Sequence, residues 1–110
     1  MAEIEMVTFN CRSVRKNVHV VRNLCDRFKL IALQETFLPQ QEGDFLNSIS
    51  SKFTCVSSSP VDLGRSLIRG RPYGGLAFLI HEEITPFVKK VSTNDERLLC
   101  IDIVFNGTKI

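Results

Sequence analysis

The first third of the chain alternates between short apolar runs and one amphipathic stretch. Residues 4–10 predict a strand, and residues 11–17 predict a polar, basic loop. Apolar residues at intervals of three and four positions then predict a helix, with Asn17 placed to cap its start. These periodic apolar positions are Val21, Leu24, Cys25 and Phe28. Residues 30–33 are wholly apolar and too short for a helix, which favours a strand covered on both faces. The pattern therefore predicts a β-α-β unit.

The middle of the chain predicts a second amphipathic helix followed by a long loop. Helical spacing of apolar residues marks this helix from about residue 42 to residue 52. Its apolar positions are Phe45, Leu46, Ile49 and Phe53. Residues 54–58 favour a third strand. Residues 59–75 hold two of the four prolines and four of the six glycines, so we expect an irregular loop. Loops of this length are usually functional or mobile.

The last third predicts strands and a hairpin turn. Residues 76–80 are apolar, and residues 87–91 alternate weakly. Residues 97–105 predict a strand with one apolar face, formed by Leu99, Ile101, Ile103 and Phe105. The dipeptide Asn106-Gly107 is typical of a type I′ hairpin turn. Only three residues follow it, which is barely the beginning of a returning strand. We therefore expect the sequence to stop within a sheet.

Composition and charge are those of an ordinary folded domain. The chain has 110 residues, of which 44% are hydrophobic and 24% charged, and this fits one small globular domain. The net charge of +2 is too small to identify a nucleic-acid-binding protein by itself. No apolar stretch approaches the roughly 20 residues needed to cross a bilayer, and no targeting peptide is recognisable at the N-terminus. We expect an intracellular protein, nuclear or cytoplasmic, with no membrane partner.

Cysteine and histidine positions argue against a zinc site. The four cysteines contain no Cys-x-x-Cys pair, and the two histidines are not at zinc-like spacing from them. In an intracellular protein we expect free thiols that fill the core. The residues concerned are Cys11, Cys25, Cys55, Cys100, His19 and His81.

An isolated acid follows the apolar residues 30–33. Glu35, in the sequence Gln34-Glu35-Thr36, is the only acid between Asp26 and Glu42. Magnesium prefers oxygen ligands, and it usually takes only one or two protein carboxylates and completes its shell with water and substrate phosphates. Glu35 is therefore a candidate metal ligand. The alternative is an ordinary solvated acid after a strand.

Three ordered sequence blocks carry a resemblance to a known family. Asn10 closes the first predicted strand, Gln34-Glu35-Thr36 follows the second, and Gly74-Gly75 opens a later one. Residues 96–103 add a fourth block. In this order the blocks resemble the endonuclease/exonuclease/phosphatase superfamily. The chain is most similar to the N-terminal half of the apurinic-like endonuclease domain carried by non-LTR retrotransposons, and the resemblance covers nearly all of it.

The resemblance implies a fold class and an incomplete domain. Family members resemble a four-layer αββα sandwich of two packed sheets, built from two halves of similar size. The fold class implied is α/β (α+β), with residues 1–110 forming one partial domain that supplies one mixed β-sheet and two flanking helices. The unpaired inner face of this sheet would expose apolar surface, which marks interaction or aggregation. A complementary C-terminal half or self-association is therefore an expected partner.

The resemblance also implies a chemistry. Intact relatives hydrolyse phosphodiester bonds of DNA with Mg²⁺ (or Mn²⁺), and the implied catalytic residues here are Asn10 and Glu35, with Glu35 on the metal. The segments that hold the family's catalytic His, its orienting Asp and an Asp-x-Asn pair would lie beyond residue 110, and His19 and His81 match neither role. Because residues that act as a unit are strongly non-additive, we expect the chain alone to be inactive and its metal binding weak or absent.

Basic residues provide candidate phosphate contacts. Arg12 follows the first strand, and Arg65, Arg69 and Arg71 lie in the long loop. In open α/β sheets, ligands collect at the edge where the strands end. Tyr73 could stack on a base or sugar. The alternatives are a solvated charged loop, a tyrosine that packs beside the glycines, and a plain turn-forming role for the asparagine at the end of the first strand.

Three alternatives stay open from the sequence. The chain could be a non-catalytic module that binds nucleic acid or protein. It could descend from a superfamily phosphatase, although residues 71–75 and 96–99 favour the endonuclease. It could also fail to fold stably.

Overall fold

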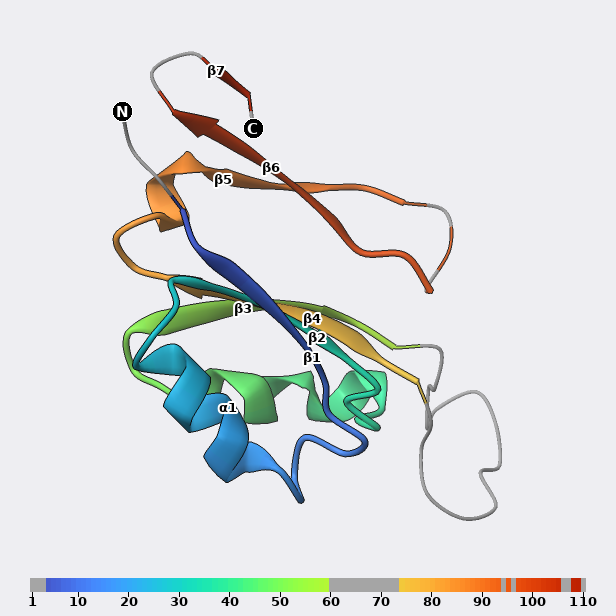
Figure 1. The fold of residues 1–110 in the computed structure, drawn as a ribbon. Coiled ribbons are helices and arrows are strands. Elements are labelled where there is room, and N and C mark those ends of the chain that lie inside the picture. The colour runs from blue at the N-terminus through green and yellow to red at the C-terminus, as the bar shows by residue number, and fades with distance from the viewer. Residues whose placement is uncertain (1–3, 60–73, 94, 96, 106–107, 110) are drawn as a thin grey trace.

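Two sheets and short helices build the molecule in layers. The computed structural model describes residues 4–59, 74–93, 95, 97–105 and 108–109 (Figure 1). The helices near the N-terminus cover one face of a four-stranded sheet, and a three-stranded sheet lies over its other face (Figure 1). None of the described helices is long and apolar enough to cross a membrane.

The four-stranded sheet is mixed, as the sequence predicted. Its strands are β1 (Met6–Asn10), β2 (Leu30–Gln34), β3 (Phe53–Ser58) and β4 (Leu76–His81), in the order β1-β2-β4-β3. β1 and β2 are parallel, whereas β4 runs antiparallel to both of its neighbours. Gln34 pairs with Asn10 on one side and with Leu76 on the other, and Leu76 also pairs with Ser58. The last residues of β1, β2 and β3 therefore meet at one edge of the sheet, where β4 begins.

The predicted β-α-β unit is confirmed, but its capping detail is different. The helix α1 (Val18–Cys25) connects β1 to β2, and Asn17 occupies its N-cap position. The Asn17 side chain makes no capping hydrogen bond. Its Nδ2 donates instead to the carbonyl oxygens of Cys11 (2.8 Å) and Ser13 (3.5 Å). This side chain therefore stabilises the loop before the helix.

The second helix is shorter and tighter than predicted. Residues 42–52 were expected to form an amphipathic helix, and the structure has a 3-10 helix, η1 (Gln40–Ser48). Gly43, Asp44 and Asn47 have low helix propensity, because glycine gains most backbone freedom on unfolding and short polar side chains compete for backbone groups. The hydroxyl of Ser48 donates to the Phe45 carbonyl oxygen at 2.6 Å, which is such a competing bond. Phe53 then begins β3.

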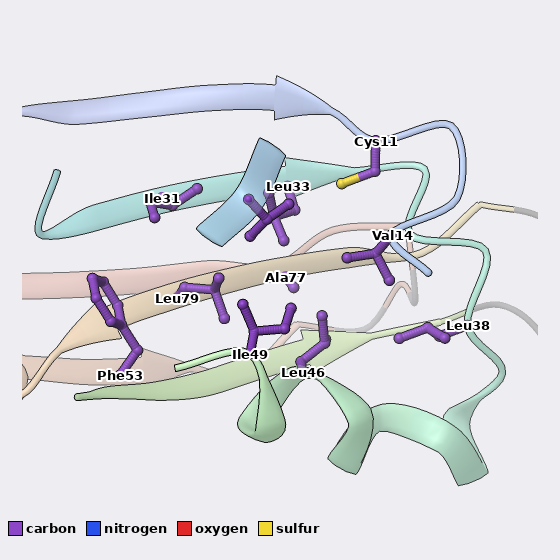
Figure 2. Close-up of a cluster of buried hydrophobic side chains, with 11 residues drawn as sticks. Cys11, Val14, Ile31, Leu33, Leu38, Leu46, Ile49, Phe53, Ala77 and Leu79 are labelled. Atoms are coloured by element: carbon purple, nitrogen blue, oxygen red, sulfur yellow. The ribbon is translucent and has the colours of Figure 1, made fainter. Parts of the chain in front are cut away.

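One core lies between the four-stranded sheet and the helices. We call it the helix-side core, and Figure 2 shows ten of its side chains labelled. Sheet residues from β2 and β4 pack there against residues from the helices and loops. Its buried members are Cys11, Val14, Val21, Ile31, Leu33, Leu38, Leu46, Ile49, Phe53, Ala77 and Leu79.

A second sheet begins within the chain, which corrects the expectation of a single sheet. After the 3-10 helix η2 (Thr85–Phe87), the strands are β5 (Val88–Val91), β6 (Cys100–Phe105) and β7 (Thr108–Lys109), in that order. β6 pairs antiparallel with β7, so the predicted hairpin is present, although residues 106–107 lie outside the described residues. β2 and β4 carry apolar side chains on both faces of the sheet. The helices bury one face, and burial of the other against the second sheet is favourable.

The cover of this second face is incomplete. An inter-sheet core of Leu30, Ile80, Ile84 and Ile103 is buried between the two sheets. Beside it lies a groove of about 440 Å³, which we call the apolar groove. Its lining residues are Ile4, Met6, Leu30, Ala32, Phe78, Ile101 and Ile103. Met6 on the outer strand β1 is 53% exposed, so part of the predicted apolar patch is present.

Candidate functional site

The candidate site is the sheet edge where β1 and β2 end. Asn10 is the last residue of β1, and Glu35 directly follows β2. Backbone hydrogen bonds continue the pairing of these strands beyond their ends. They run from Cys11 N–H to Gln34 O (2.8 Å), from Ser13 N–H to Glu35 O (3.0 Å) and from Val14 N–H to Thr36 O (3.0 Å). The β1–α1 loop is therefore fixed to the residues that surround Glu35.

A third segment reaches the same place from the start of β4. The Thr36 N–H donates to the Gly75 carbonyl oxygen at 3.2 Å, and the Phe37 N–H donates to that of Gly74 at 2.8 Å. Glu35 is thus held between the β1–α1 loop on one side and the Gly74-Gly75 pair on the other. The three segments with family-like motifs meet at one point.

This point carries unusual backbone geometry. Among the described non-glycine residues, positive φ angles occur at Arg12 (44°), Ser13 (89°), Glu35 (51°) and Phe37 (56°). All four lie in the two loops that the hydrogen bonds join. A left-handed residue of this kind costs roughly 1–3 kcal/mol and persists only where surrounding contacts enforce it, most often at functional sites. The concentration of positive φ angles therefore supports the choice of this end of the sheet as the candidate site.

The side chains at this edge present oxygen donors. Asn10 is exposed, and its Oδ1 accepts a hydrogen bond from the Arg12 N–H at 3.3 Å. Strand alternation places Asn10 with Met6 on the face that looks toward the three-stranded sheet, whereas Phe9 packs against the helix-side core. Glu35 is half-buried. A carboxylate and an amide oxygen on adjacent strand ends fit a hard cation such as Mg²⁺, which needs few protein ligands.

Other metal and nucleophile chemistry has less support. Within the described residues, no group of three or more His, Cys, Asp or Glu side chains could hold a metal ion. Burial, together with the smaller effect of the negative charge of Glu35, raises the pKa of Cys11 from 9.0 to about 12. The Cys11 thiol therefore stays protonated and is a poor nucleophile beside the site.

All four cysteines are free, as predicted, but one of them is not a core filler. Cys11 is buried, and Cys25 and Cys55 are partly buried. Cys100 on β6 is exposed.

Only one of the predicted basic contacts, Arg12, lies within the described residues. Arg12 is exposed at the site, and within the described residues its guanidinium forms no ion pair. Arg15 in the same loop is bound to η1, because its Nη2 lies 2.5 Å from Glu42 Oε1 and its guanidinium lies 4.4 Å from the Phe45 ring centre. The other predicted contacts lie outside the described residues, namely Arg65, Arg69, Arg71 and Tyr73.

Sequence reasoning did not identify two residues that shape the site. Thr36 is buried beside Glu35, and Ser13 is buried in the loop from β1. The Gly74-Gly75 pair was the available signal, because consecutive glycines at a strand start indicate close backbone approach. The sequence does not show which residue approaches them.

Comparison with known proteins identifies the fold. No protein-family model matches the chain, and no curated protein is significantly similar to it. Solved structures do match. A 3′ phosphatase NExo from Neisseria, bound to a product DNA hairpin, aligns over 97% of this chain and 39% of its own, with a TM-score of 0.60 and 19% identity. The likeness establishes the fold.

Two further structures support the same conclusion. The 3′-5′ exonuclease NExo from Neisseria meningitidis aligns over 94% of this chain and 38% of its own, with a TM-score of 0.56 and 20% identity. An AP endonuclease from Archaeoglobus fulgidus aligns over 97% of this chain and 39% of its own, with a TM-score of 0.56 and 18% identity. The predicted α+β nuclease-like fold is confirmed, and the chain spans less than two-fifths of the length of these structures.

Proposed function

We propose that the chain is the N-terminal part of a Mg²⁺-dependent phosphodiesterase domain of the endonuclease/exonuclease/phosphatase type, which acts on DNA. One observation carries the proposal. Three segments far apart in the sequence meet at Glu35 through five backbone hydrogen bonds, and they hold Glu35 in a left-handed conformation. A solvated acid after a strand would not require such enforcement.

Each residue of the edge has a proposed role. Glu35 would hold the metal (Mg²⁺ or Mn²⁺), which when bound supplies stabilisation of negative charge on the phosphate. Asn10, on the adjacent strand end, would orient the phosphate through its amide. Arg12 is exposed in the loop that follows Asn10, and we propose it as a phosphate contact. Arg65, Arg69 and Arg71 are proposed as further phosphate contacts, and Tyr73 as a stacking residue.

The described residues of this edge offer no histidine for water activation. His81 lies at the opposite end of β4 from Gly75 and packs edge-on against the Phe53 ring, with the ring centres 5.1 Å apart. We therefore propose that activity needs a complementary C-terminal half that brings its own base, and that the chain alone is inactive. The order of the motifs supports an origin in a non-LTR retrotransposon endonuclease.

Reconstitution tests this function. The chain alone should cut neither plasmid nor abasic DNA with Mg²⁺ or Mn²⁺, and added C-terminal half of a related endonuclease should restore cutting. Glu35→Gln should then lower the rate more than about 100-fold, since changes to residues that only support a metal ligand cost roughly 10–100-fold. Glu82→Gln is the matched control, because Glu82 is exposed just beyond the opposite end of β4.

Two outcomes would overturn the proposal. Cutting by the chain alone that Glu35→Gln abolishes would mean that the base lies within these residues. Reconstituted cutting that Glu35→Gln leaves unchanged would remove Glu35 from the site. A 3′-phosphorylated oligonucleotide in the same assay separates the phosphatase alternative from the endonuclease.

The apolar groove favours a second candidate function, a non-catalytic binding module. About 440 Å³ lined only by apolar side chains suits a protein contact. DNA affinity that falls steeply with salt would instead indicate phosphate contacts.

A further inference from the structure

At the candidate site, Gly75 packs so closely against Thr36 that no side chain fits between them. A Cβ atom added to Gly75 would lie 2.2 Å from Thr36 Oγ1, a separation that real side chains do not show. Thr36 itself is only 3% exposed, so its side chain is enclosed. Gly75 also has a φ of +96°, which side chains rarely adopt. Glycine at this position is therefore required twice, by conformation and by space.

The backbone of Thr36 leaves it little freedom to move. Its N–H donates to Gly75 O at 3.2 Å, and its carbonyl oxygen accepts from the Val14 N–H at 3.0 Å. The residues before and after it, Glu35 and Phe37, are both left-handed. A displacement of Thr36 must therefore be absorbed by these two residues, and Glu35 shares a peptide bond with it.

We propose that Gly75 is a positioning residue for Glu35, which acts through Thr36. The bare backbone at position 75 lets the Thr36 side chain stay buried, and the buried Thr36 holds the adjacent Glu35 in its left-handed conformation at the sheet edge. The inference rests on the proposed function, in which Glu35 is the metal ligand. It adds a specific contact between the start of β4 and the metal-binding residue.

The geometry identifies the atom that makes this contact selective. With a Cβ at position 75, the Thr36 Cβ would lie at 3.5 Å and the Phe37 nitrogen at 3.6 Å, which are ordinary contacts. Only the Thr36 hydroxyl oxygen is too close. Removing that oxygen should therefore make room for a side chain at position 75, whereas replacing it with a methyl group of similar size should not.

Paramagnetic broadening by Mn²⁺ tests the proposal on the chain itself, because it detects weak binding. In ¹⁵N amide spectra of the wild type, Mn²⁺ should broaden the signals around Glu35 and Asn10, and Glu35→Gln should abolish this. Gly75→Ala should require about tenfold more Mn²⁺ for the same broadening, since disturbing the support of a metal ligand costs roughly 10–100-fold in affinity.

Two double variants separate positioning from a general loss of structure. Gly75→Ala with Thr36→Ala should recover most of the wild-type broadening, whereas Gly75→Ala with Thr36→Val should not. Both carry the same backbone strain of alanine at a positive φ, so their difference reports the contact with the Thr36 side chain alone. Equal behaviour of the two, or an undiminished response in Gly75→Ala, would overturn the proposal.

The remaining outcomes of the experiment also test the positioning role of Gly75. If Gly75→Ala unfolds, Thr36→Ala must restore a dispersed amide spectrum and Thr36→Val must not. If the wild type shows no local Mn²⁺ broadening, the chain alone does not bind the metal. The positioning contact is then decided by whether the Glu35–Phe37 amide shifts return to wild-type values only with Thr36→Ala.

Discussion

The two faces of the four-stranded sheet differ in how completely they are covered. On the helix side, eleven buried residues form one closed core. On the other side, four buried residues of the described part of the chain lie beside a groove of about 440 Å³. The difference shows that, within the described residues, the packing is closed on one face of the sheet and only partly closed on the other.

The candidate site belongs to the better-packed half. Glu35 follows β2, whose Ile31 and Leu33 are fully buried in the helix-side core. Asn10 ends β1, whose Val7 and Phe9 pack on that core and whose Met6 borders the groove. A partner that filled the groove would thus lie beside the strand that carries Asn10. Under the proposed function, binding of a complementary C-terminal half and completion of the site are expected to be coupled.

Matched substitutions in the two cores should show the largest difference between the two faces of the sheet. Leu33→Ala should lower the free energy of unfolding by roughly 3–5 kcal/mol, because it leaves a cavity in a closed core. Ile103→Ala, beside the groove, should cost roughly 2 kcal/mol, because neighbouring side chains there can relax into the space. Urea unfolding curves measure both. Equal costs would mean that the inter-sheet side is as well packed as the helix side.

Filling the groove should give the next largest effect. The chain alone should bind the dye ANS or self-associate, since apolar surface is accessible. A C-terminal half that binds only the folded chain should stabilise it by about 2.7 kcal/mol at a hundredfold excess over Kd. Thermal melts, dye fluorescence and sedimentation follow these changes. A dye-negative, cooperative monomer that the added half leaves unchanged would contradict the half-domain model.

The smallest expected effect is a loss of folding stability at alkaline pH, which arises from cysteines in or beside the helix-side core. Burial raises the pKa of Cys11 and Cys55 from 9.0 to about 12, and that of Cys25 to about 11. The folded state therefore holds these protons more tightly than the unfolded chain. The stability is fully present below pH 9.0 and is lost as the pH rises toward about 12.

Unfolding curves at increasing pH measure this loss. Cys100→Ser is the control, because Cys100 is exposed on the three-stranded sheet and its replacement should leave the pH profile unchanged. A thiol reagent should react with Cys100 first. Rapid reaction of Cys11 in the folded chain would show that the helix-side core opens locally.

The local elements follow closely from the sequence. The apolar run at β2, the helical spacing in α1 and the Asn106-Gly107 hairpin are short-range signals, and each corresponds to a described element. The helix predicted over residues 42–52 was wrong in its bounds and its type. The apolar spacing was read correctly, but the backbone preferences of the residues between do not favour an α-helix. Leu46 and Ile49 are buried as expected, but Leu46 lies in a 3-10 helix and Ile49 is the C-cap residue of that helix.

Tertiary structure alone decided how the motifs are joined. The sequence determined that Asn10, Glu35 and Gly75 belong to strand ends, because apolar patterns and glycine pairs are local properties. It did not determine the close packing of Gly75 against Thr36 or the second sheet over β2 and β4. These depend on residues distant in sequence, whose contacts exist only after the strands pair. A residue's chemistry is encoded locally, whereas its geometry is set by the segments that pack around it.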